Sequence, residues 1–162
     1  MADLGLYALR LSLLVAVVGI GAGVHAGLRG DAASGRVARR AATLLFVFTS
    51  LSMVSLFWAF AGHDFRLEYV ATHSARSMPL HYRLAALWGG QSGSLLLWLW
   101  MLAAYSLAAV AVHRRTSREL MPWVIAVLLG NALFFLVLLN FVTNPFERVP
   151  PGFLQSDGNG LN

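Results

Sequence analysis

Four long apolar runs most strongly constrain what this chain can fold into. They cover about residues 6–26, 41–61, 94–112 and 120–142. An α-helix rises about 1.5 Å per residue, so roughly 20 apolar residues are enough to cross the hydrocarbon layer of a membrane. The sequence therefore predicts an all-α, polytopic membrane protein with four transmembrane helices. A long loop at residues 62–93 and a tail at residues 143–162 complete the chain.

The composition supports this class. Charged residues make up only 12% of the chain, against about 25% in soluble domains. The chain contains no cysteine, which excludes disulfides, thiolate zinc sites and a cysteine nucleophile. The first run is not expected to be a signal peptide, because it has no basic n-region and no cleavage site before a soluble domain.

The arginines predict the orientation of the helices. All twelve basic residues are arginines, and seven of them fall in two short loops, residues 28–40 and 113–119. Short cytoplasmic loops are enriched in basic residues, so both loops are expected in the cytoplasm. The N-terminus, the 62–93 loop and the 143–162 tail are then outside. In a membrane protein the net charge of +5 indicates orientation rather than a nucleic-acid partner.

Local patterns add several expectations. Residues 28–40 are expected to form a polar loop, and the period of two at residues 65–72 suggests a short extended segment. Ser77 and Ser117 are candidate N-caps for a short interfacial helix and for the fourth span. Asn131 and Asn140, which lie within the fourth span, are expected to find hydrogen-bonding partners inside the bundle.

A glycine-rich stretch, Gly-Gly-Gln-Ser-Gly at residues 89–93, is the least generic part of the sequence. Glycine lets the backbone bend and approach a neighbour closely. We expect a hinge here, where an interfacial helix beginning near Pro79 turns into the third span.

Histidines and tryptophans surround this hinge. His63, His73 and His81 fall on the predicted outer face, and imidazole is a common metal and haem ligand. Their spacing matches no compact ligand motif, so hydrogen bonding to loop backbone is the alternative, and no metal site or catalytic motif is predicted. Trp88 and Trp98, together with Trp100, are candidates either for an aromatic floor under a flat ligand or for interface anchoring and packing.

Several segments together resemble one known family. Residues 81–82 and 85–98 look like the outer-loop signature of CcmF/NrfE-type cytochrome c haem lyase subunits. Residues 65–74 are similar to the lead-in of that signature, and residues 143–146 and 157–162 resemble the segment after the family's fourth span. Family members often have an acid where this chain has Ser92, which leaves any charge-dependent role of that position open.

The resemblance implies a role in system I cytochrome c maturation at the bacterial inner membrane. The cofactor would be haem, and the partners would be a haem chaperone, apocytochrome c, other maturation-complex subunits and membrane lipids. The chain resembles the N-terminal quarter of such a lyase, with the haem ligands expected outside it, no catalytic residue of its own, and His73 and His81 as speculative ligand or docking residues. The expected haem-site scaffold comprises Trp88, Gly89, Gly90, Gln91, Gly93 and Trp98.

Two other functions remain open at this point. The chain could be a small four-span transporter or ion-pump accessory subunit, with Asn131, Asn140 and the serines of the second span along a path. The absence of an acid at mid-depth of any span weakens a cation route. The third reading is a structural membrane scaffold without a ligand.

Overall fold

The protein is described by a computed structural model, which covers residues 1–113, 119–150, 152 and 157–159. Over these residues the chain forms six α-helices and no β-strand longer than one isolated bridge, between Leu67 and Arg148. The helices are α1 (Ala2–Arg29), α2 (Ala32–Ala61), α3 (Glu68–His73), α4 (Leu80–Ala86), α5 (Gln91–His113) and α6 (Met121–Phe141).

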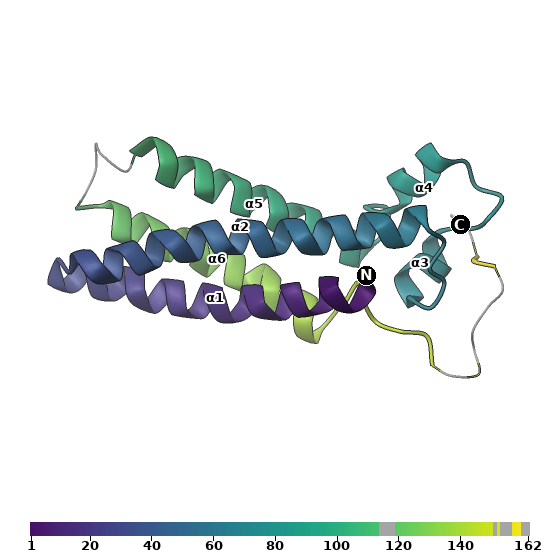
Figure 1. Ribbon diagram of the computed structural model, residues 1–162, viewed down its shortest axis with the longest axis horizontal. Coiled ribbons are helices and arrows are strands. Elements are labelled where there is room, and N and C mark those ends of the chain that lie inside the picture. The colour runs from purple at the N-terminus through teal and green to yellow at the C-terminus, as the bar shows by residue number, and fades with distance from the viewer. Residues whose placement is uncertain (114–118, 151, 153–156, 160–162) are drawn as a thin grey trace.

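The four long helices lie side by side in one elongated bundle (Figure 1). Helices α1, α2, α5 and α6 are each long and apolar enough to cross a membrane, which confirms the predicted all-α, four-span class. The short helices α3 and α4 lie at one end, together with the N-terminus. We call this end, with residues 62–90, 143–149 and 157–159, the cap end. The opposite end, residues 26–40, 107–113 and 119–123, is the arginine end.

The predicted polar loop at residues 28–40 is wrong, because the turn between α1 and α2 consists of Gly30 and Asp31 alone. Gly30 takes the left-handed conformation (φ 66°) that ends α1. The Asp31 carboxylate then accepts hydrogen bonds from the backbone N–H groups of Ala33 and Ser34 and starts α2. Hydrogen bonds from Ser34 lower the pKa of Asp31 to about 2. All four arginines expected in a loop therefore lie on helices, Arg29 at the end of α1 and the other three on α2.

Small residues allow α1 to approach α6 closely. A Cβ atom added to Gly23 would lie 2.8 Å from the carbonyl oxygen of Pro122. One added to Gly27 would lie 2.5 Å from the indole of Trp123. Both positions are closer than a side chain tolerates, so glycine is required for this crossing.

Polar side chains inside the bundle are satisfied mostly by backbone carbonyls. The Ser52 hydroxyl donates across the α1–α2 interface to the carbonyl of Gly5 (3.0 Å). Both asparagine amides find hydrogen-bonding partners, but within their own helix: Asn131 and Asn140 donate to carbonyls one turn earlier in α6. Asn131 is also exposed, so it lines no interior path for a transported ion.

The cap end differs from its prediction. The extended segment predicted at residues 65–72 is helical from Glu68 onward, and only Leu67, which pairs with Arg148, keeps an extended conformation. Tyr69, Val70 and Ala71 are consecutively buried, which a period of two cannot describe. Helix α4 starts after Pro79 without a side-chain cap, so the Ser77 cap is wrong as well. Ser117 lies outside the described residues.

Candidate functional site

The glycine-rich stretch joins α4 to α5 at the cap end. Helix α4 ends at Ala86 and α5 begins at Gln91, so residues 87–90 form the connection. We call residues 87–93 the glycine turn. Gln91 and Gly93 thus belong to the first turn of α5, which starts three residues earlier than the predicted span.

The side chain of Tyr69, on α3, is hydrogen-bonded to the glycine turn. Its hydroxyl accepts a hydrogen bond from the N–H of Gly90 (3.1 Å) and donates one to the carbonyl of Leu87 (3.0 Å). The side chain is buried, and burial raises the pKa of the Tyr69 hydroxyl. The phenol therefore stays protonated near neutral pH and remains a donor.

Two glycines are required by this arrangement. A Cβ atom at Gly90 would overlap Nε2 of His73 and the ring of Tyr69, and one at Gly93 would overlap the carbonyl oxygen of Leu87. The predicted close backbone approach is therefore confirmed at Gly90 and Gly93. Gln91 and Gly89, in contrast, are exposed on the surface of the turn.

The three histidines of this region have different surroundings. The ring of His73 packs against Tyr69 with 4.5 Å between ring centroids, and its Nδ1 lies 3.1 Å from the Tyr69 carbonyl oxygen. His81 is exposed on α4 and packs against Tyr82. His63, which has a positive φ of 54°, lies at the end of α2.

Arg83 joins His63 to the carboxyl end of α2. Its guanidinium donates to Nε2 of His63 (2.6 Å) and to the carbonyl of Ala61 (3.1 Å). Because a guanidinium has no acceptor, this contact requires a neutral imidazole. Burial, and then the charge of Arg83, lower the pKa of His63 accordingly. The contact fixes α4 over the end of α2.

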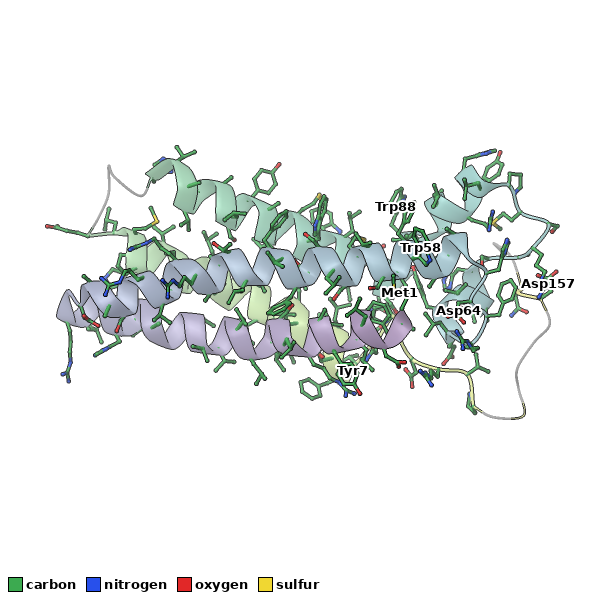
Figure 2. The ribbon with its side chains drawn as sticks, in the orientation of Figure 1. Met1, Tyr7, Trp58, Asp64, Trp88 and Asp157 are labelled. Atoms are coloured by element: carbon green, nitrogen blue, oxygen red, sulfur yellow. The ribbon has the colours of Figure 1, made fainter. Side chains whose placement is uncertain are left out.

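The tail folds back onto the same end. The Ser92 hydroxyl lies 2.6 Å from that of Thr143. Further along, the Asp157 carboxylate accepts a hydrogen bond from the backbone N–H of Arg76 (2.8 Å), and Asn159 N–H donates to the carbonyl of Ala71 (2.8 Å). Figure 2 shows Asp157 beyond Asp64 at this end of the molecule. Segments at residues 65–74, 81–98, 143–146 and 157–159 therefore converge.

Comparison with known proteins finds relatives that match nearly the whole chain. The chain is 35% identical over 161 residues to the cytochrome c-type biogenesis protein CcmF of Haemophilus influenzae, covering 99% of this chain and 25% of that protein. It is 36% identical over 160 residues to CcmF of Pseudomonas aeruginosa, covering 99% and 24%. A solved structure titled cytochrome c haem lyase CcmF superposes with a TM-score of 0.82 at 31% identity, covering 93% of this chain and 25% of that one.

The chain belongs to the CcmF/NrfE family. No family model matches it, so the assignment comes from these individual relatives. The chain spans about a quarter of the length of the curated relatives named above.

The CcmF/NrfE family implies haem, but the described residues of the cap end do not supply a set of axial ligands for it. His63 contacts Arg83 through Nε2, and His73 packs its Nε2 against Gly90 while its Nδ1 faces a carbonyl oxygen. His81 is exposed on α4 and packs against Tyr82. Within the described residues no group of three or more His, Cys, Asp or Glu side chains is placed to hold a metal ion.

The two tryptophans of the predicted scaffold do not stack into a common floor. Trp88 and Trp98 are exposed by 50% and 59%, and neither takes part in an aromatic pair within the described part of the chain. Figure 2 places Trp88 at the outer surface beside α4. Trp100, in contrast, is partly buried, and its indole N–H donates a hydrogen bond to the hydroxyl of Ser50 (2.9 Å).

Sequence reasoning missed Tyr69 and Arg83 as organising residues. Each lies in a segment whose pattern carried the wrong period or no clear period. The available signal was a large aromatic ring with a hydrogen-bonding hydroxyl for Tyr69, and a lone arginine in a short, largely apolar helix for Arg83.

Proposed function

We propose that this chain forms the N-terminal four-helix part of a haem lyase that serves cytochrome c maturation. The observation that carries the proposal is the convergence of four separate family-like segments on one end of the bundle. Only the fold brings them together, since they are spread between residues 65 and 159. A role in transport receives no comparable support, because the asparagines of α6 bond to their own helix.

In this proposal the cap end shapes one wall of a haem site whose ligands come from outside these residues. Tyr69, Gly90 and Gly93 fix the backbone of the glycine turn. Trp88 and Gln91 are thereby held at the surface, where an apolar face and an amide are available to a flat, partly charged ligand such as haem. The chain itself contributes positioning and not bond-making chemistry.

The proposed partners are a haem chaperone, apocytochrome c and the remaining maturation subunits. His81 and Tyr82 are exposed and adjacent on α4, and we expect docking at these two residues. The cap end would face the periplasm and the arginine end the cytoplasm of a bacterial inner membrane, as the distribution of arginines favours.

A chimera tests the proposal. The matching quarter of CcmF from Pseudomonas aeruginosa is replaced by this chain and produced in a strain that lacks its own CcmF. Covalently bound haem in c-type cytochromes is then measured by haem staining and by the pyridine haemochrome spectrum. We expect the chimera to restore holocytochrome c. A chimera that reaches the membrane in normal amount but yields no holocytochrome would refute the proposal.

A further inference from the structure

Three arginines form a stripe along one face of α2 at the arginine end. Arg39 and Arg40 follow Arg36 by three and four residues, so the three side chains share a helix face. They line a groove of about 340 Å³ between α2 and α5. Its remaining lining consists of one hydroxyl and an apolar wall: Thr43, Leu107, Val110 and Ala111.

Among the described residues that line this groove, none is acidic. The ion pairs within the described residues, Asp64 with Arg66 and Asp3 with Arg148, both lie at the other end of the bundle. Like charges at these spacings repel one another on a helix. An anion held between the arginines would remove that repulsion, and guanidinium groups bind phosphate oxygens through paired hydrogen bonds.

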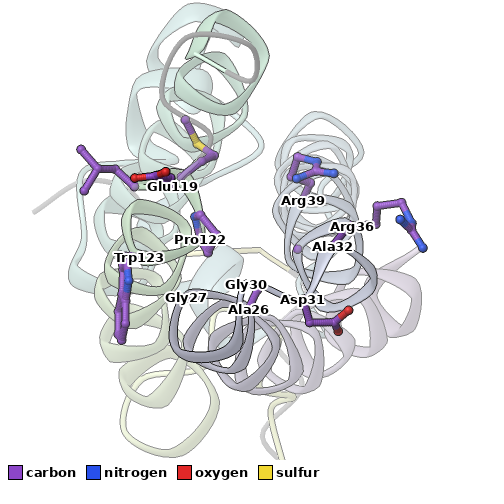
Figure 3. Close-up of a pocket in the computed structure, with 13 residues that line it drawn as sticks. Ala26, Gly27, Gly30, Asp31, Ala32, Arg36, Arg39, Glu119, Pro122 and Trp123 are labelled. Atoms are coloured by element: carbon purple, nitrogen blue, oxygen red, sulfur yellow. The ribbon is translucent and has the colours of Figure 1, made fainter.

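A neighbouring cavity of about 990 Å³ shares Arg36 and Arg39 with the groove. Figure 3 shows these arginines on α2, across the cavity from Trp123 and Glu119. This cavity also contains two carboxylates. That of Asp31 is engaged by the first turn of α2, whereas Glu119 faces the cavity from the far side. The groove has no carboxylate among its described lining residues and is therefore the better anion site of the two.

We propose that this groove binds the phosphate headgroup of an anionic phospholipid. The phosphate would lie between Arg36, Arg39 and Arg40, and an acyl chain would run along Leu107 and Val110. A lipid fits better than a free phosphate ion, because the wall below the arginines belongs to a membrane-spanning helix and is apolar. Basic grooves between transmembrane helices commonly bind anionic lipid headgroups.

Lipid competition tests this site on the purified full chain. The protein is equilibrated in micelles with equimolar phosphatidylglycerol and phosphatidylcholine, and the bound lipids are counted by native mass spectrometry. We expect the bound lipid to be mainly phosphatidylglycerol. Replacing Arg39→Gln should lower the preference about fivefold, since one basic residue near a lipid surface contributes about that factor. Arg39→Lys should retain most of it.

The matched control is Arg29→Gln, which removes the same charge at the same end from a residue that lines neither cavity. If Arg29→Gln lowers the preference as much as Arg39→Gln, general surface charge explains the binding and the groove site is refuted. Displacement of the lipid by inorganic phosphate would refute the lipid assignment. A second measurement uses photoactivatable phosphatidylglycerol in vesicles: cross-links should map to residues 107–111, and cross-links elsewhere only would overturn the proposal.

Discussion

The hydroxyl of Tyr69 is the atom on which the shape of the glycine turn most depends, and Tyr69→Phe removes it without changing the ring. The two short hydrogen bonds are lost, one from Gly90 N–H and one to the Leu87 carbonyl, together with a longer contact to the Ala86 carbonyl (3.5 Å). Leu87 is almost fully buried, so its carbonyl is left without a partner, at a cost of about 1–3 kcal/mol. Gly90 is partly exposed and can turn to water. We therefore expect a loss of about 2 kcal/mol in unfolding free energy.

The assay is equilibrium unfolding in mixed micelles, followed by tryptophan fluorescence, together with hydrogen exchange at the Gly90 amide. Tyr105→Phe is the matched control, because Tyr105 is 74% exposed on α5 and its change should stay within about 0.5 kcal/mol. Exchange at Gly90 should accelerate in Tyr69→Phe only. The reasoning is refuted if the two variants unfold alike and exchange at Gly90 is unchanged in both.

Three further predictions follow from the same contacts. Gly93→Ala should destabilise the chain by about 2 kcal/mol or more, because its Cβ would overlap a backbone carbonyl. Gly21→Ala has open space around it and should be neutral or slightly stabilising. Equal changes in unfolding free energy for the two variants would contradict this. The pKa of His63 should lie below its ordinary value of 6.5, so the cap end is fully stable above pH 6.5 and loses stability as the pH falls below it. NMR titration should show that Arg83→Gln moves the pKa of His63 part of the way back. The same pKa in Arg83→Gln and in the unaltered protein would argue against the contact. Ser52→Ala should cost about 1 kcal/mol by removing its bond to a carbonyl of α1, and chemical unfolding with no measurable change would rule that bond out as a stabilising contact.

The sequence predicted the membrane helices well because apolar length is a local property. Every span needs only its own residues to be recognised. The helical course of residues 32–40 was missed for a local reason too. Arginines and small residues suggested a loop, whereas the Asp31 cap and the buried Ala38 make them the first turns of α2.

The site was only partly predictable because its geometry is non-local. That Gly90 and Gly93 require glycine could be expected, but not that Tyr69, some twenty residues earlier, is the group that packs beneath them. The prediction of an extended segment at residues 65–72 was wrong because three consecutive residues of α3, Tyr69 to Ala71, are buried. Such burial is incompatible with the alternation that marks a strand. Trp98 was grouped with Trp88, and both side chains are exposed, but the sequence did not predict that they take part in no aromatic pair within the described residues.

The most direct test of the central claim is the yield of holocytochrome c from the CcmF chimera carrying Gly93→Ala, compared with that carrying Gly21→Ala. Both changes add one methyl group to a glycine of the same chain, but only the first disturbs the glycine turn. If the cap end shapes the haem site, Gly93→Ala should abolish most covalent haem attachment at normal membrane levels of the chimera, while Gly21→Ala should retain it. Equal yields from the two variants would contradict the account.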